Sequence, residues 1–157
     1  METELLRWLA ALAAAFIGST FALSRTKRER RWQAKYDAYQ RIFAAVEAIR
    51  FWAEETYSSS LSLPSIGSAQ DLAQRFDDAK RELWGFVHVG GLVVSAKSQE
   101  ALQDLLTEVS RVEFAFDDEG KDENNYAAVL SEHCDQVRQI VARHLPVLLQ
   151  LGKKDLR

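Results

Sequence analysis

Proline, glycine and cysteine are all scarce in this sequence, with 2, 7 and 1 residues among 157. Proline and glycine are the strongest helix breakers, whereas the abundant Ala, Leu, Glu, Arg and Gln favour helices. The composition therefore predicts an all-α chain with a single hydrophobic core. The lone cysteine, Cys134, cannot form an internal disulfide, which is typical of proteins in a reducing compartment.

Sequence motifs that carry chemistry are also missing. There is no Gly-rich phosphate loop, the acidic stretch 117–125 lacks the calcium-loop pattern, and no His has a Glu three residues before it, as helical di-iron sites require. His133 and His144 share a predicted helix face but lie about 16 Å apart along its axis, too far to bind one metal ion. We therefore predict no catalytic residue, cofactor or metal. We interpret these histidines as core or boundary residues, with pH sensing as the alternative.

Charged residues are absent from residues 8–23, an apolar run that Leu5 and Leu6 extend past Arg7. About nineteen residues are just enough to span a bilayer, so we predict a transmembrane anchor over residues 1–24. A helix lying on the membrane surface and a cleaved signal peptide are the alternatives. A signal peptide needs positive charge before its apolar run, whereas the positive charge here follows the run.

Six basic residues follow the apolar run within eleven positions, namely Arg25, Lys27, Arg28, Arg30, Arg31 and Lys35. Cations beside a span stay on the cytoplasmic side, so we predict a single-pass protein of the cell inner membrane with its N-terminus outside. Residues 25–35 are then a juxtamembrane polybasic helix that contacts the anionic headgroups of membrane lipid. Nucleic acid is an unlikely partner for these cations, because lipid would occupy them.

Small residues recur at every fourth position of the predicted span, at Ala10, Ala14, Gly18 and Ala22. Such a ridge lets two transmembrane helices approach closely, which predicts a homo-oligomer or docking on the span of a protein partner. The alternative interpretation is that a run rich in alanine produces this spacing by composition alone.

Four amphipathic segments follow the anchor. No proline or glycine separates Leu23 from Tyr57, so we expect the anchor to continue as one helix, and three further helices are expected to begin near Ser68, Ser95 and Asn125. The connections are a Ser-rich loop over 58–68, an apolar stretch over 87–95 that could be a hairpin, an extended crossing or a loop, and the acidic loop 117–125. Two breakers are expected near the C-terminus, because Pro146 should kink or end the last helix and Gly152 should stop it.

The expected fold is an N-terminal transmembrane helix that continues into an up-down-up-down four-helix bundle over residues 36–157. In this topology the stretch 87–94 and the basic C-terminal segment face the membrane, and the acidic loop lies at the far end. The apolar stretch could equally well plug the end of the bundle without touching lipid.

These features predict a non-enzymatic interaction, scaffold or regulatory module, or a small subunit of a membrane complex. The alternative is a helical effector, such as a nucleic-acid-binding bundle or a ribonuclease of the HEPN type, in which an Arg precedes a His by a few residues. Arg138 with His144, and Arg81 with His88, have about this spacing. Two such pairs are close to chance expectation for a chain with 13 Arg and 3 His.

Overall fold

The chain folds as four α-helices and one short 3₁₀ turn in a computed structural model. The structure describes the backbone of residues 2–64, 66–119 and 125–157, and the side chains of residues 25–64, 66–117 and 125–157. The elements are α1 (Glu2–Ser60), α2 (Ala69–Val89), η1 (Gly90–Leu92), α3 (Ala96–Glu119) and α4 (Tyr126–Asp155). Within these ranges there is no β-strand, so the prediction of an all-α chain with four helices is confirmed.

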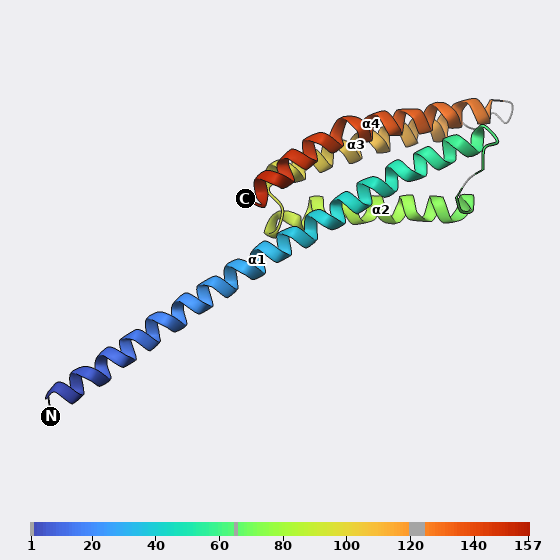
Figure 1. Cartoon of the computed structure of the whole chain (residues 1–157). Coiled ribbons are helices and arrows are strands. Elements are labelled where there is room, and N and C mark those ends of the chain that lie inside the picture. The colour runs from blue at the N-terminus through green and yellow to red at the C-terminus, as the bar shows by residue number, and fades with distance from the viewer. Residues whose placement is uncertain (1, 65, 120–124) are drawn as a thin grey trace.

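Successive helices alternate in direction, and each packs against its neighbours in an up-down-up-down arrangement (Figure 1). The N-terminal part of α1 projects beyond the bundle, while η1 and the C-terminus lie at the end where α1 enters it. We call this the proximal end. The α1–α2 connection, the end of α3 and the start of α4 lie at the opposite, distal end.

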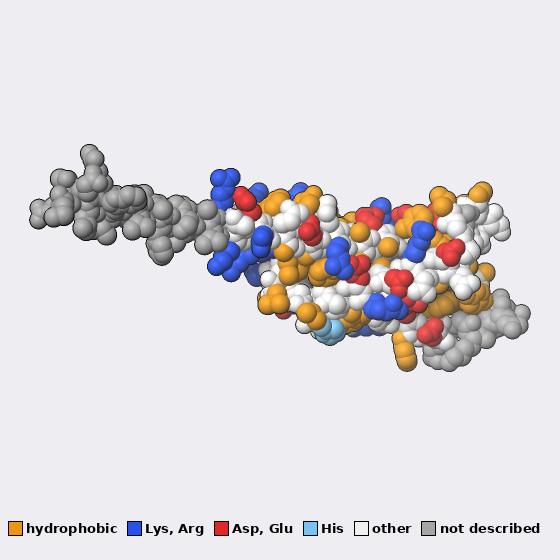
Figure 2. Space-filling view, turned by 90° about the horizontal axis from the view of Figure 1, so that it is seen from below, with side chains coloured by type: hydrophobic (Ala, Val, Ile, Leu, Met, Phe, Trp, Pro, Cys, Tyr) orange, Lys and Arg blue, Asp and Glu red, His pale blue; other side chains and the backbone are white. Residues whose placement is uncertain are grey.

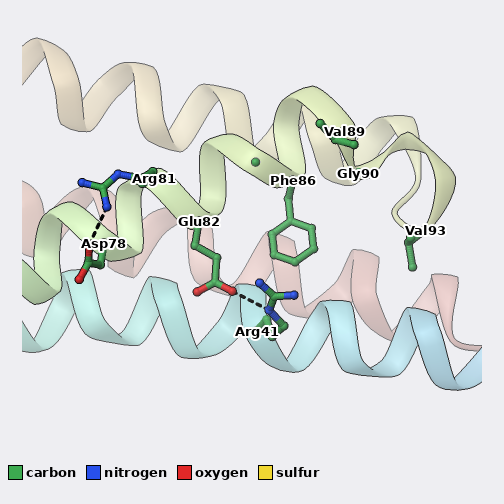
Figure 3. Close-up of a pocket in the computed structure, with 9 residues that line it drawn as sticks. Arg41, Asp78, Arg81, Glu82, Phe86, Val89, Gly90 and Val93 are labelled. Atoms are coloured by element: carbon green, nitrogen blue, oxygen red, sulfur yellow. Dashed lines mark hydrogen bonds and ion pairs between the residues drawn. The ribbon is translucent and has the colours of Figure 1, made fainter.

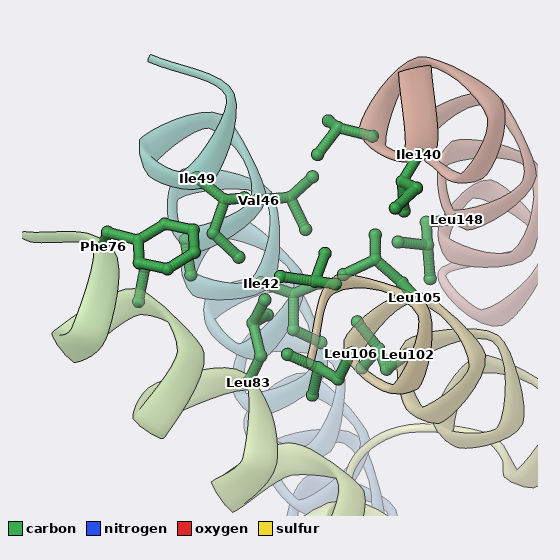
Figure 4. Close-up of a cluster of buried hydrophobic side chains, with 14 of the residues drawn as sticks. Ile42, Val46, Ile49, Phe76, Leu83, Leu102, Leu105, Leu106, Ile140 and Leu148 are labelled. Atoms are coloured by element: carbon green, nitrogen blue, oxygen red, sulfur yellow. The ribbon is translucent and has the colours of Figure 1, made fainter. Parts of the chain in front are cut away.

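The core lies between the four helices and is built by residues that recur every three or four positions (Figure 4). This spacing places them on one face of each helix, as the sequence predicted. Each fully buried Leu or Ile contributes about 1.5–3 kcal/mol to folding, so such a core can hold the bundle together. Fully or almost fully buried examples are Ile42, Val46, Ile49, Phe76, Leu83, Leu102, Leu105, Leu106, Ile140 and Leu148.

The predicted helix starts at Ser68 and Ser95 are present. The backbone N–H of Asp71 donates to Ser68 Oγ at 3.1 Å, and that of Ser98 donates to Ser95 Oγ at 3.3 Å. The helix ends differ from expectation, because α1 continues to Ser60 and α2 to Val89. The apolar connection over 87–95 is therefore neither a hairpin nor an extended crossing. It is the last turn of α2 followed by η1.

The last helix ends neither at Pro146 nor at Gly152, because α4 runs through both residues to Asp155, so the prediction that Gly152 stops it was wrong. Proline removes the hydrogen bond to the carbonyl four residues earlier. Here Pro146 and Ala142 are both exposed, so water can solvate that carbonyl. Gly152 is buried against α1, where a Cβ would lie 3.0 Å from Tyr39 Cδ1, so it serves close helix packing.

The predicted anchor, residues 1–24, lies outside the residues whose side chains the structure describes. Its backbone from Glu2 onward belongs to α1, which continues without a break into the bundle, as expected. Within the part of the chain that the structure describes, no helix is both long enough and apolar enough to cross a membrane.

Candidate functional site

The polybasic segment lies on the exposed length of α1 next to the bundle. Its first five cations are exposed, and Figure 2 shows Lys and Arg side chains gathered where α1 meets the other helices. Arg25 pairs with Glu29 at 2.9 Å, one helical turn away. The other exposed cations of this segment form no ion pair with any described residue. They are Lys27, Arg28, Arg30 and Arg31. Their charge is therefore available to an anionic surface.

The sixth cation, Lys35, belongs to a seam between α1 and the end of α4. Lys35 Nζ donates to the backbone carbonyl of Asp155 at 3.3 Å, and Trp32 Nε1 donates to that of Leu156 at 3.1 Å. The Tyr36 ring stacks on Trp32 with centroids 5.4 Å apart. These bonds satisfy carbonyls that a helix C-terminus leaves without partners. The contacts between α1 and α4 therefore begin at Trp32.

A buried polar network at the proximal end joins three helices. Asp155 Oδ2 accepts hydrogen bonds from the Tyr39 hydroxyl, from Ser98 Oγ at 3.3 Å and from the Ser95 backbone N–H at 3.2 Å. Burial alone would raise the pKa of Asp155, but these hydrogen bonds lower it overall. Burial, together with the bond to Asp155, raises the pKa of Tyr39 to about 12. The network ties the C-terminus of α4 to α1 and to the start of α3.

The turn at η1 has an inner and an outer side. Val94 is 3% exposed and belongs to the core, whereas Val89 is 72% and Leu92 is 92% exposed. The Gln99 side-chain amide donates to the carbonyls of Phe86 and Val87, both at 3.2 Å. These bonds fix the end of α2, so the exposed apolar residues sit on an ordered support.

A groove with a volume of about 520 Å³ runs between α1 and α2 toward the proximal end (Figure 3). This volume lies in the range of small-molecule pockets. Arg41 pairs with Glu82 at 2.6 Å and lies over the Phe86 ring at 5.5 Å, and Arg81 pairs with Asp78 at 2.8 Å. The charges of the groove are thus paired within the chain.

His133 lies in the core near the distal end, as the sequence suggested. Its ring stacks on Phe116 and meets Trp52 edge-on, and it makes a backbone hydrogen bond to Val112. Burial lowers the pKa of His133, so the ring is neutral at pH 7. No group among the described residues bonds its Nδ1. A cavity of about 180 Å³ adjoins it.

The Arg and His residues considered for a ribonuclease each have other contacts. Arg138 and His144 lie about 120° apart around α4. Arg138 contacts Asp135 and the Tyr57 ring, whereas His144 Nε2 lies 3.3 Å from Glu108 on α3. In the other pair, Arg81 binds Asp78, and His88 stacks on Trp84. In the described part of the chain no group of three or more His, Cys, Asp or Glu could hold a metal ion.

The small-residue ridge at Ala10, Ala14, Gly18 and Ala22 lies outside the residues whose side chains the structure describes. Sequence reasoning missed the network around Asp155, because it treated the helix that contains Tyr39 only as an amphipathic segment. The one available signal was the Tyr39 hydroxyl, since a buried tyrosine normally needs a hydrogen-bond partner.

No protein-family model, curated protein or solved structure matches this chain.

Proposed function

We propose that this chain is a single-pass, membrane-anchored helical bundle that acts without catalysis as an interaction or regulatory module. Its N-terminus lies outside the inner membrane and its bundle in the cytoplasm. In this role it serves as a small subunit of a membrane assembly. The proposal requires residues 1–24 to enter the bilayer.

The observation that carries the proposal is the exposed polybasic segment between the apolar run and the bundle. Residues 25–35 contain six Lys or Arg and one Glu, a net charge of +5. Each cation beside an anionic leaflet contributes about 1 kcal/mol to membrane binding. The same residues oppose transfer across the bilayer, which orients the chain.

Exposed apolar side chains at the distal end support a protein partner. Ile66 and Leu63 in the α1–α2 connection, and Phe114 near the end of α3, all project into solvent. Such side chains favour protein contacts when they lie away from lipid. The paired charges of the α1–α2 groove, and the separate contacts of Arg138 and His144, support a role without catalysis.

Membrane integration is tested by fractionation. The wild-type chain is expected to remain in the membrane fraction through high salt and alkaline carbonate, since hydrocarbon burial does not depend on salt. Replacing Ala13 and Ile17 by Asp is expected to release it, because each charge at mid-span opposes insertion by about 2.5–3.5 kcal/mol. The matched control, Ile66→Asp at the distal end, should leave it bound. A wild-type chain found in the soluble fraction at low salt refutes the proposal.

A further inference from the structure

The apolar surface of the turn after α2 lies at the end of the bundle from which α1 emerges (Figure 1). Val89 and Leu92 project outward from it, while Val94 faces the core. A leucine that is 92% exposed adds nothing to core packing. Val94 therefore closes the end of the core, as one interpretation of the sequence suggested. The exposed side chains of Val89 and Leu92 have no part in that role.

This turn is held in one conformation. The backbone N–H groups of Val93 and Val94 both donate to the Gly90 carbonyl, at 2.8 and 2.7 Å. The side-chain amide of Gln99 lies 3.6 Å from where a Cβ of either Gly90 or Gly91 would stand, while it bonds the end of α2. A rigid turn presents its apolar side chains without an ordering cost on binding.

Cations flank the turn. Lys97 in the first turn of α3 is exposed, and so are Lys153 and Lys154 at the end of α4. Asp155 lies among them, but its carboxylate accepts three internal hydrogen bonds. In Figure 2, hydrophobic side chains lie beside the Lys and Arg side chains at this end of the bundle. Apolar tips with exposed lysines on the neighbouring elements are complementary to an anionic bilayer surface.

The distances allow this contact. The bundle begins at Trp32, so the eight residues from Ser24 span about 12 Å of helix. The headgroup layer is about 5–7 Å thick on each side. A spanning helix is tilted by about 20° on average, and a tilt toward the turn lowers it toward the headgroups.

We infer that Val89 and Leu92, with the lysines around them, form a membrane-contacting finger that holds the base of the bundle against the anionic leaflet. The finger is a second lipid contact, separate from the anchor. It fixes the orientation of the bundle on the membrane. This inference rests on the proposed anchoring.

The test places a fluorophore on the finger of the full-length chain. Leu92→Cys is labelled with an environment-sensitive dye, and Ile66→Cys, which is 70% exposed at the distal end, is the matched control. The native Cys134 is buried, and burial raises its pKa to about 11, so it does not compete for the label. Both proteins are reconstituted in nanodiscs of phosphatidylcholine, with or without one-third phosphatidylglycerol, and quenched with brominated lipid.

Quenching at position 92 in the anionic discs, without quenching at position 66, supports the finger. Lys153→Gln and Lys154→Gln should each reduce the ratio of docked to undocked finger about fivefold. Equal emission at positions 92 and 66 overturns the inference, as does equal quenching in neutral and anionic discs. A chain that fails to co-purify with the discs overturns the proposed function instead, so the two failures are distinguishable.

Discussion

Gly152 offers the sharpest test of how α1 and α4 pack. A Cβ at this position would lie 3.0 Å from Tyr39 Cδ1 and 3.2 Å from Phe43 Cζ. The Tyr39 ring is 2% exposed, and its hydroxyl is bonded to Ser98 and Asp155, so the ring cannot retreat. Gly152→Ala therefore forces α4 away from α1.

Two opposing effects set the size of the change. Alanine is about 1 kcal/mol better than glycine inside a helix. Overpacking a tight interface costs about 1–3 kcal/mol. We expect Gly152→Ala to lower the free energy of unfolding by about 1 kcal/mol, which corresponds to a fall in Tm of about 4 °C for a domain of this size.

Gly85 is the matched control, because it lies within α2 and a Cβ there would meet nothing within 4 Å. Gly85→Ala should stabilise the bundle by about 0.5–1 kcal/mol. Helix propensity is common to both substitutions, so the difference between the two variants isolates the packing penalty. Urea unfolding of the full chain in nonionic detergent, followed by circular dichroism, measures both.

Two results would refute the reasoning. The first is an equal increase in stability for both glycine substitutions, which would mean that the α1–α4 interface yields freely. The second comes from combining Gly152→Ala with Tyr39→Phe. Removing the hydroxyl frees the ring, so the packing penalty should shrink in this background. An unchanged penalty would show that Tyr39 is not what resists the added methyl group.

Three further predictions concern α4, His133 and the span. Pro146→Ala should raise the urea midpoint by the equivalent of about 1–2 kcal/mol, because it restores the hydrogen bond to the Ala142 carbonyl at some cost in unfolded-state entropy. An unchanged midpoint would mean that α4 is not helical there. Burial lowers the pKa of His133 below 6.5, so its contribution to stability is present above pH 6.5 and is lost as pH falls below it. The urea midpoint should therefore drop between about pH 7 and pH 5 in wild type and less in His133→Gln, and equal drops would contradict this. Gly18→Ile should abolish crosslinking between copies in membranes if the small-residue ridge joins two spans, and retained crosslinking counts against the ridge.

The number of helices and their buried faces could be predicted because both depend on local periodicity. The stripe from Tyr39 through Val46, and the caps at Ser68 and Ser95, can be recognised in a few consecutive residues. The core of the bundle follows from them directly.

The wrong expectations about where α4 ends arose because context overrides local propensity. A proline is tolerated where the carbonyl it deprives faces water, and a glycine within a helix can serve packing against a residue more than a hundred positions away. Asp155 could not be assigned a role for the same reason. Its partners Tyr39 and Ser98 are distant in sequence, and only the closed bundle brings them together.

Residues 19–60 of α1 contain neither proline nor glycine, so this helix has no hinge between its projecting part and the core. A continuous helix of this kind transmits rotation and axial displacement from one end to the other. Any rotation imposed on its outer half must either turn the whole bundle or break the seam that Trp32 and Lys35 make with α4. The bundle is thus coupled to α1 through that seam, and the projecting part and the core move as one body while the seam is intact.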